Sequence, residues 1–446
     1  MKGNAMPQGF SAGDTAWLLV SAALVLLMVP GLALFYGGMV RVKSALNMLM
    51  MSFACLAVVT VVWVVAGYSL AFGPDAGGGL IGGLRHVGLQ GIDGHHLTGS
   101  VPTAAFAAFQ LMFAVITAAL LSGAIADRAK FGAWIGFVAV WVLAVYVPIA
   151  HWVFGGGWIA THLRIFDLAG GTVVEINSGA SGLALALVLG PRLGFRGDPM
   201  RPHSLPLVVL GAGLLWFGWF GFNAGSALTA GGGAAMAFLN TQVAGAAAIC
   251  GWLVVERLRD GHPTTLGAAS GAVAGLVAIT PSCGSVSPLG ALAIGAIAGA
   301  ACCFAVSLKY RLGYDDSLDV AGVHGVGGLL GTLLIGLLAT SAVTGGDSGL
   351  LYGGGLALLG RQAMAVVVVA AYAFGVTWLL AKGVDRLVGF RVSEEHERTG
   401  LDLVVHAETA YELHATSGGA RTVVPHQGLS HAPRPARLDA NPVDGQ

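Results

Sequence analysis

Charged residues are scarce in this sequence. Asp, Glu, Lys and Arg make up 10% of the 446 residues, whereas a soluble domain has about 25%. The 22 basic and 22 acidic residues balance, so the net charge gives no support to nucleic-acid binding. Because 56% of the residues are hydrophobic, this shortage of charge excludes an ordinary soluble domain and predicts an integral membrane protein with many spans.

Catalytic and metal-binding patterns are also lacking. The cysteines have no metal-ligand spacing, and we interpret them as small packing residues in mostly apolar runs: Cys55, Cys250, Cys283, Cys302 and Cys303. An intramembrane hydrolase would need a nucleophile–base pair or a motif such as His-Glu-x-x-His, and the sequence has neither. We therefore predict no enzyme activity, no metal and no cofactor.

Long apolar runs, by contrast, are abundant. A helical span needs about 20 apolar residues, and the 70 glycines suit helices that pack closely in lipid. We expect an all-α integral membrane protein of eleven transmembrane helices, with the termini on opposite sides. The first run also fits a signal peptide, but "LFYGGMV" is a poor cleavage site. The expected spans are roughly 16–37, 48–72, 102–124, 132–150, 169–190, 204–222, 234–255, 264–281, 288–308, 320–340 and 362–382.

Basic residues indicate the orientation of the spans. With the N-terminus outside and the C-terminus inside, 18 of the 22 basic residues fall on the cytoplasmic side. This predicts a multi-pass protein of the cell inner (plasma) membrane. We expect a membrane domain over 1–382, a cytoplasmic segment over 383–413 and a disordered tail over 414–446. The charges of the cytoplasmic segment are expected to be solvated: Glu394, Glu395, Glu397 and Arg398.

Two spans begin alike. Asp167 starts "DLAG" and Asp319 starts "DVAG", and each Asp is expected to cap a Gly-rich helix. Glu175 follows eight residues after the first Asp, and His324 follows five residues after the second. The two spans lie five apart in opposite orientations. We interpret them as an inverted repeat of spans 1–5 against 6–10 plus one extra helix, which places a site near the midplane.

Glu175 and His324 are the candidate functional residues of that site. An ionisable group in mid-membrane is costly, and therefore indicates function by default. A carboxylate and an imidazole in an apolar core can take and relay a proton. The alternative is a structural hydrogen-bonding pair, and for Asp167 capping alone is the favoured explanation.

Aromatic residues gather toward the predicted outer side. Phe109 and Phe113 share a face of span three, and Phe154 and Trp158 flank a "GGG". An interfacial aromatic belt accounts for such residues, and cation–π capture of a small cation is the other interpretation. Ser226 is placed to accept a hydrogen bond from that cation. A further cluster lies at the end of span six: Trp216, Trp219, Phe220 and Phe222.

Several ordered motifs together resemble the ammonium transporter (Amt/Mep/Rh) family, on its bacterial Amt branch. They are "DTAWLLVSAALVLLMVPGLALFYGGMVRVKS", "DLAGGTVVEIN", "GWFGFNAGS", "DVAGVHGVGG" and "ERTGLDLVVHAETAYEL", and the match runs from about Asp14 to Leu413. The resemblance implies a homotrimer in which each subunit has eleven spans and its own narrow hydrophobic pore. It implies uptake of ammonium or ammonia, with methylammonium as an analogue.

The resemblance also assigns roles to positions of this sequence. Phe113 and Phe222 correspond to a stacked gate, Ser226 to the hydroxyl of the outer recruitment site, and His324 to the second pore histidine. Asp167 corresponds to a structural aspartate of span five.

Two positions depart from the family pattern. Glu175 stands in place of the first pore histidine, as in some fungal relatives, and Phe154 stands in place of the outer-site Trp, a role that Trp158 is placed to take over. Phe is the weaker cation–π partner and has no N–H donor.

Other functions remain open at this point. An ammonium sensor is the main alternative, and it would need a separate partner because the tail after Leu413 is too short for an output domain. A PII-type signalling protein at the cytoplasmic face is the partner that the resemblance implies, although Ala407 stands where Gly is expected. A carbon dioxide channel is a further alternative.

Overall fold

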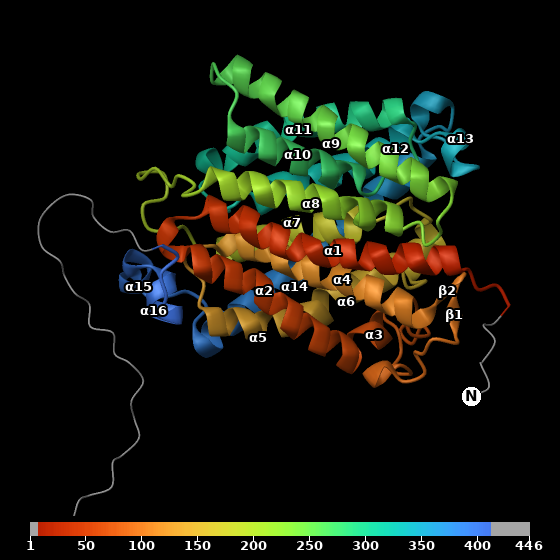
Figure 1. The fold of residues 1–446 in the computed structure, drawn as a ribbon, viewed down its shortest axis with the longest axis horizontal. Coiled ribbons are helices and arrows are strands. Elements are labelled where there is room, and N and C mark those ends of the chain that lie inside the picture. The colour runs from red at the N-terminus through yellow and green to blue at the C-terminus, as the bar shows by residue number, and fades with distance from the viewer. Residues whose placement is uncertain (1–7, 412–446) are drawn as a thin grey trace, which may run out of the picture. The chain divides into compact units, whose positions relative to one another are not determined.

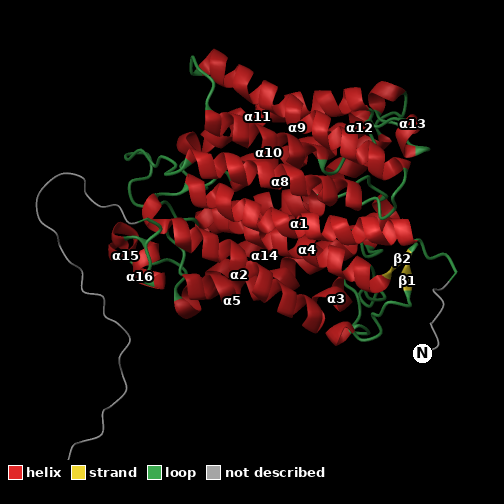
Figure 2. Cartoon of the chain, in the orientation of Figure 1, coloured by secondary structure: helices red, strands yellow, loops and turns green. Residues whose placement is uncertain are grey.

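The computed structural model of the chain describes residues 8–411. They form a bundle of helices that run side by side (Figure 1), and only one short ribbon of strands is seen in the described part of the chain (Figure 2). The ribbon pairs β1 (Leu97–Thr98) with β2 (Val101–Pro102) in antiparallel register. It lies at the end of the bundle where α1 begins, whereas α15 and α16 lie at the opposite end (Figure 1).

The helices follow one another along the chain with few long connections. The α-helices are α1 (Ala12–Met39), α2 (Ala45–Val62), α3 (Tyr68–Phe72), α4 (Thr103–Leu121), α5 (Phe131–Trp141), α6 (Val147–Val153), α7 (Asn177–Leu189), α8 (Leu205–Gly225), α9 (Gly232–Arg259), α10 (Thr265–Ile279), α11 (Pro288–Leu312), α12 (Val326–Leu338), α13 (Ser341–Thr344), α14 (Ala357–Val388), α15 (Glu394–Thr399) and α16 (Leu401–His406). The 3-10 turns are η1 (Val42–Ser44), η3 (Val87–Leu89), η4 (Ser122–Ile125) and η9 (Leu350–Tyr352). The π-helical segments are η2 (Trp63–Gly67), η5 (Val142–Tyr146), η6 (Ile159–Leu163), η7 (Gly171–Ile176) and η8 (Ala321–Gly325).

The expected all-α membrane protein is confirmed. Among the described residues, ten helices are long and apolar enough to cross a membrane. A helix also occupies the remaining expected range, 264–281, but α10 has only 15 residues and is shorter than the others. The last long helix, α14, continues to Val388, so the expected end of the membrane domain at 382 falls inside a helix.

Two of the long helices begin with a π-helical turn. η7 precedes α7 and carries Glu175, whereas η8 precedes α12 and carries His324. A π-helical turn widens the backbone spiral and is found frequently at functional sites. The two segments contact each other, so they bring the two ionisable residues together.

The caps of these two segments confirm one expectation and correct another. Asp167 accepts hydrogen bonds from the N–H groups of Gly170 and Thr172, at 2.9 and 2.8 Å, as a cap should. Asp319 was expected to cap the second segment, and this is wrong. Asp316 does so instead, by accepting from Val320 N and Ala321 N at 3.1 and 2.7 Å.

Asp319 has a different role because its backbone turns the other way. Its φ is +65°, a left-handed conformation from which the chain enters η8, and its carboxylate pairs with Lys309 at 2.6 Å. With Asp316 as the cap, the two π-helical segments have the same spacing between the capping Asp and the ionisable residue. Asp167 precedes Glu175 by eight residues, and Asp316 precedes His324 by eight.

The cytoplasmic segment of the sequence-based prediction is docked on the ends of the helices. Asp402 of α16 accepts from Leu46 N and Asn47 N at 3.0 and 2.8 Å, so it caps α2. Lys43 donates to the carbonyls of α15. The expectation that Glu397 is solvated is wrong: it is 2% exposed and accepts from Leu193 N and Arg391. The tail predicted from 414 onward lies outside the described residues.

Candidate functional site

A stacked pair of buried rings lies beside a small cavity inside the bundle. Phe113 of α4 and Phe222 of α8 are both buried, and their ring centroids are 4.2 Å apart with an interplanar angle of 19°. Phe109, one turn earlier on α4, tilts against Phe113 with a centroid distance of 4.9 Å. The rings leave no room for a hydrated ion between them, so an ion that passes must lose its water.

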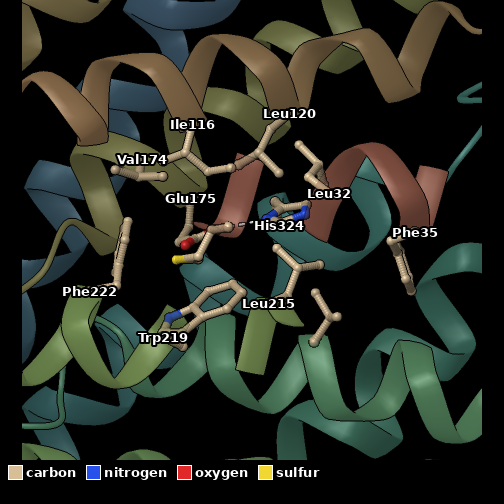
Figure 3. A pocket seen from close by; sticks show the side chains of 12 residues that line it. Leu32, Phe35, Ile116, Leu120, Val174, Glu175, Leu215, Trp219, Phe222 and His324 are labelled. Carbon is tan, nitrogen blue, oxygen red and sulfur yellow. Dashed lines mark hydrogen bonds and ion pairs between the residues drawn. The ribbon is translucent and has the colours of Figure 1, made fainter. Parts of the chain in front are cut away.

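A small apolar chamber lies directly beyond this pair. It has room for roughly one water molecule. Figure 3 shows Phe222 on one side of the chamber and Glu175 and His324 pointing into it between aliphatic side chains. The lining residues are Met28, Leu32, Phe35, Ile116, Leu120, Val174, Glu175, Leu215, Trp219, Phe222, Val273 and His324.

Glu175 and His324 form a buried acid–base pair. Nδ1 of His324 is 2.7 Å from Oε2 of Glu175 (dashed line in Figure 3). A carboxylate only accepts, so the geometry assigns a proton to Nδ1 whenever Glu175 is ionised. The second carboxylate oxygen, Oε1, is buried and has no hydrogen-bond partner among the described residues. An acceptor of this kind, next to a chamber with room for one small molecule, suits a cation or an N–H donor.

A second cavity continues the path beyond His324. It shares Phe35, Val273 and His324 with the chamber and adds polar groups toward the end where α15 and α16 lie. Ser270 and Asp319 are among these groups, and the carboxylate of Asp319 is paired with Lys309. His324 therefore stands between the two cavities, where it can pass a proton or a small ligand from one to the other.

Glycines of α7 and α12 allow each helix to approach the π-helical segment of the other. A Cβ at Gly179, four residues after Glu175, would lie 2.2 Å from Gly325 Cα. A Cβ at Gly328, four residues after His324, would lie 2.7 Å from the Cβ of Glu175. Thus α7 presents a glycine to η8 and α12 presents one to η7, each four residues after its own ionisable residue. This reciprocal contact places the acid and the base within hydrogen-bond range.

The remaining predicted site residues lie at the end of the bundle where α1 begins. Ser226 follows α8, and its hydroxyl donates to Phe222 O at 2.8 Å, which leaves its oxygen free to accept. Phe154 and Trp158 follow α6 and are partly exposed. Trp158 packs on Trp152 with a centroid distance of 6.1 Å. Trp158 is therefore held in a tryptophan cluster beside α6.

The comparison with known proteins identifies the family of this arrangement. The model of the Ammonium Transporter Family matches residues 16–411. The chain belongs to the ammonium transporter family. It is 54% identical over 436 residues to an ammonium transporter of Mycobacterium tuberculosis, with 91% of each chain covered. It is 47% identical to ammonium transporter Amt1 of Archaeoglobus fulgidus, with 90% of this chain and 100% of the relative covered.

Solved structures agree with this membership of the ammonium transporter family. The crystal structure of Saccharomyces cerevisiae Mep2 has a TM-score of 0.82 and 37% identity, and the match covers 87% of this chain and 89% of Mep2. A structure titled Sensor Amt Protein has the same TM-score at 30% identity. The family and these relatives are transporters rather than enzymes, as the sequence predicted.

Two residues of the site were missed in the sequence. Trp219 was counted among the outer aromatics, yet it lines the chamber and donates its indole N–H to Thr280 Oγ1 at 2.9 Å. Asp316 was overlooked because Asp319 begins the more obvious repeat. The signal that identifies Asp316 is the equal spacing of eight residues from cap to ionisable residue.

Proposed function

We propose that this protein transports ammonium through the path formed by the Phe113–Phe222 stack, the chamber and the second cavity. The observation that carries the proposal is the Glu175–His324 pair, which is the acid–base group of an otherwise apolar chamber. The stack admits an ammonium ion only without its water. A bare cation is costly in an apolar space, so the ion is stable there only if a carboxylate faces it or takes its proton.

The chemistry at the pair is a proton transfer. Ammonium gives one proton to the free Oε1 of Glu175, and the products are ammonia and a neutral carboxyl group. For the proton to continue, the ring proton of His324 must first move from Nδ1 to Nε2; the carboxyl then donates to Nδ1, and Nε2 releases its proton beyond the pair. Neutral ammonia then crosses the apolar chamber at low cost. Transport is the favoured function over sensing because the two cavities share His324 and form a path.

Recruitment is proposed to take place before the stack. Phe113, Phe154 and Trp158 offer ring faces to the cation, and the Ser226 oxygen accepts one of its hydrogen bonds. Asp167 serves as the structural cap of η7 and thereby positions Glu175.

The finer architecture belongs to the same proposal. We infer eleven spans, with α10 as the short one, arranged as an inverted repeat of five and five plus α14. The equal cap spacing and the reciprocal glycines support this repeat. The distribution of basic residues supports an N-terminus outside and a C-terminus in the cytoplasm of the cell inner membrane.

Assembly and partners are proposed from family membership. The subunit is proposed to form a homotrimer in lipid, with a membrane domain over 1–382. The segment over 383–413 is proposed to be regulatory, with a PII-type signalling protein as its partner at the cytoplasmic face. The docking of α15 and α16 on the ends of other helices supports a regulatory role for this segment.

Solid-supported-membrane electrophysiology on purified protein in liposomes tests the transport mechanism. An ammonium jump should move charge in the wild type, and Glu175→Gln should reduce the current about tenfold or more, because a charged partner is replaced by a neutral one. Glu175→His shows whether the carboxylate makes transport electrogenic. Glu256→Gln is the matched control, since this buried carboxylate bonds Trp252 and Thr264 and lines neither cavity. Wild-type currents in Glu175→Gln would refute the role of Glu175.

A further inference from the structure

A buried histidine outside the path is joined to a loop at the outer end of the bundle. His151, on the last turn of α6, has a side chain that is 0% exposed. Its Nδ1 lies 2.9 Å from Ala71 O, and its Nε2 lies 3.4 Å from Oδ1 of Asp75. Asp75 belongs to residues 74–83, a glycine-rich loop that we call the outer strap. Neither side chain takes part in the transport path.

The outer strap holds the segment that carries the candidate recruitment rings. Oδ1 of Asp75 accepts from Gly77 N and Gly79 N, at 3.3 and 2.8 Å, and so shapes the strap. Gly79 O in turn accepts from Trp158 N at 3.0 Å. On the other side of the segment, His151 O accepts from Gly155 N and Gly157 N. Residues 154–158 are thus held between the strap and His151.

The outer strap and residues 154–158 pack closely, and the glycines at this contact have no room for a side chain. A Cβ at Gly155 would lie 2.0 Å from Ala71 O, and a Cβ at Gly79 would lie 2.9 Å from Trp158 N. Trp152 adds a bond from its indole N–H to Leu80 O at 2.8 Å. A shift of the strap must therefore move the backbone on which Phe154 and Trp158 sit.

Both partners of the His151 ring are acceptors. A backbone carbonyl is only an acceptor, and so is an ionised carboxylate. The pKa of Asp75 lies below its ordinary value. The hydrogen bond from Gly79 N is the largest cause, and those from Gly77 N and the His151 ring add to it, so Asp75 is ionised near neutral pH. Both ring contacts are favourable only when both nitrogens carry a proton. Loss of the Nε2 proton would turn a lone pair toward the carboxylate.

Neighbouring titratable groups have other partners. Tyr68 on α3 packs against the rings of Trp63 and His86. Tyr372 on α14 donates to Ala144 O, His162 on η6 bonds Thr161, and Glu175 on η7 pairs with His324. Among the described residues, Asp75 is the charged group that contacts the His151 ring.

We propose that Asp75 and His151 form a positioning latch that sets how well the outer site recruits a cation, and that external pH operates it. With His151 protonated, the strap is held and residues 154–158 are fixed. With His151 neutral, the strap is released and the rings of Phe154 and Trp158 lose their alignment. This inference rests on the proposed recruitment role of those rings.

The test measures methylammonium transport in proteoliposomes while the pH outside is varied from about 5.5 to about 8. Aliphatic amines have a pKa of about 10.4, so the probe stays protonated throughout. In the wild type, the apparent KM should rise about two- to fivefold toward alkaline pH, the worth of an exposed cation–π contact, while the maximal rate is unchanged.

Asp75→Asn keeps an oxygen for Gly77 N and Gly79 N but removes the charge that favours protonated His151. It should have the alkaline KM at every pH, and His151→Gln should behave in the same way. Asp93→Asn is the matched control, because Asp93 and His96 form a second pair, at 2.9 Å, that is exposed on the same outer loop and apart from the strap. The control should keep the wild-type profile.

The outcomes separate the latch from the transport proposal. A wild-type KM that does not change with pH, or a wild-type profile in Asp75→Asn, would overturn the latch, as would a flat profile in Asp93→Asn. If His151→Gln fails to assemble, Asp75→Asn decides. Absence of saturable transport in the wild type would instead refute the proposed function itself.

Discussion

A methyl group at Gly179 tests whether backbone contact sets the acid–base pair. A Cβ there would lie 2.2 Å from Gly325 Cα and 2.3 Å from Gly325 N, whereas ordinary van der Waals contact begins at 3.4 Å. Both neighbours are backbone atoms and cannot rotate away. Helix α7, which continues η7, must therefore separate from η8 by about 1 Å, at a cost of about 1–3 kcal/mol in unfolding free energy.

This separation acts on the hydrogen bond between Glu175 and His324. The bond measures 2.7 Å, and a lengthening of about 1 Å takes it beyond the usual limit of about 3.2 Å. A hydrogen bond to a charged group contributes about 1.5–3 kcal/mol net. If proton transfer depends on this bond, Gly179→Ala should reduce transport about tenfold or more, a factor that corresponds to about 1.4 kcal/mol.

Two measurements on one preparation check this prediction. Thermal unfolding in detergent reports the packing cost, and methylammonium uptake into proteoliposomes reports the loss of function. Gly136→Ala on α5 is the control, because an added Cβ there meets open space, and it should stabilise the helix by about 0.5–1 kcal/mol. Equal uptake and equal unfolding temperatures in the two variants would refute the reasoning.

Two further predictions concern the end of the bundle where α15 and α16 lie. Asp402→Ala removes the acceptor that caps α2, at a cost of about 1 kcal/mol in unfolding free energy. Limited proteolysis after residue 400 should therefore be faster in Asp402→Ala than in Asp402→Asn. Equal cleavage rates would contradict the cap. Burial raises the pKa of Asp315, but Arg192 and Arg128 outweigh it, and the pKa lies below its ordinary value. Such a carboxylate contributes stability above the unfolded pKa of about 3.9, and this stability is lost as the pH falls. Asp315→Asn should therefore lower the unfolding temperature at pH 7, with a difference from wild type that shrinks below about pH 4; a difference that stays constant would contradict the ion pair.

The helices were predictable because their signal is local. Each long apolar run becomes a helix, since every backbone group in lipid must be satisfied within its own segment. Helix ends were less predictable. α14 continues to Val388 because Lys382 and Arg386 are good helix formers at its exposed end, and a change in composition does not by itself end a helix.

The candidate site was predictable only where the motif and the fold agree. Phe113 and Phe222 could be paired from the family resemblance, and the structure stacks them. Three aspartates, Asp315, Asp316 and Asp319, precede η8, and the sequence alone does not show which one turns back to cap it.

Long-range contacts of polar residues could not be predicted from the sequence. Glu397 looks like a solvated charge until Leu193 N and Arg391 are placed beside it. The contact between Asp75 and His151 likewise joins segments 76 residues apart. Such pairs depend on how loops return to helix ends, and hydrophobic periodicity carries no information on that.

The two matching helix starts carry unlike side chains on a similar backbone frame. Each start has an Asp that caps it eight residues before the ionisable residue and a close-packed glycine four residues after it. The chemistry of the two starts is not alike, because one carries an acid and the other a base. The backbone frame is therefore shared by the two helix starts, and the acid–base character of the pair lies in one side chain from each.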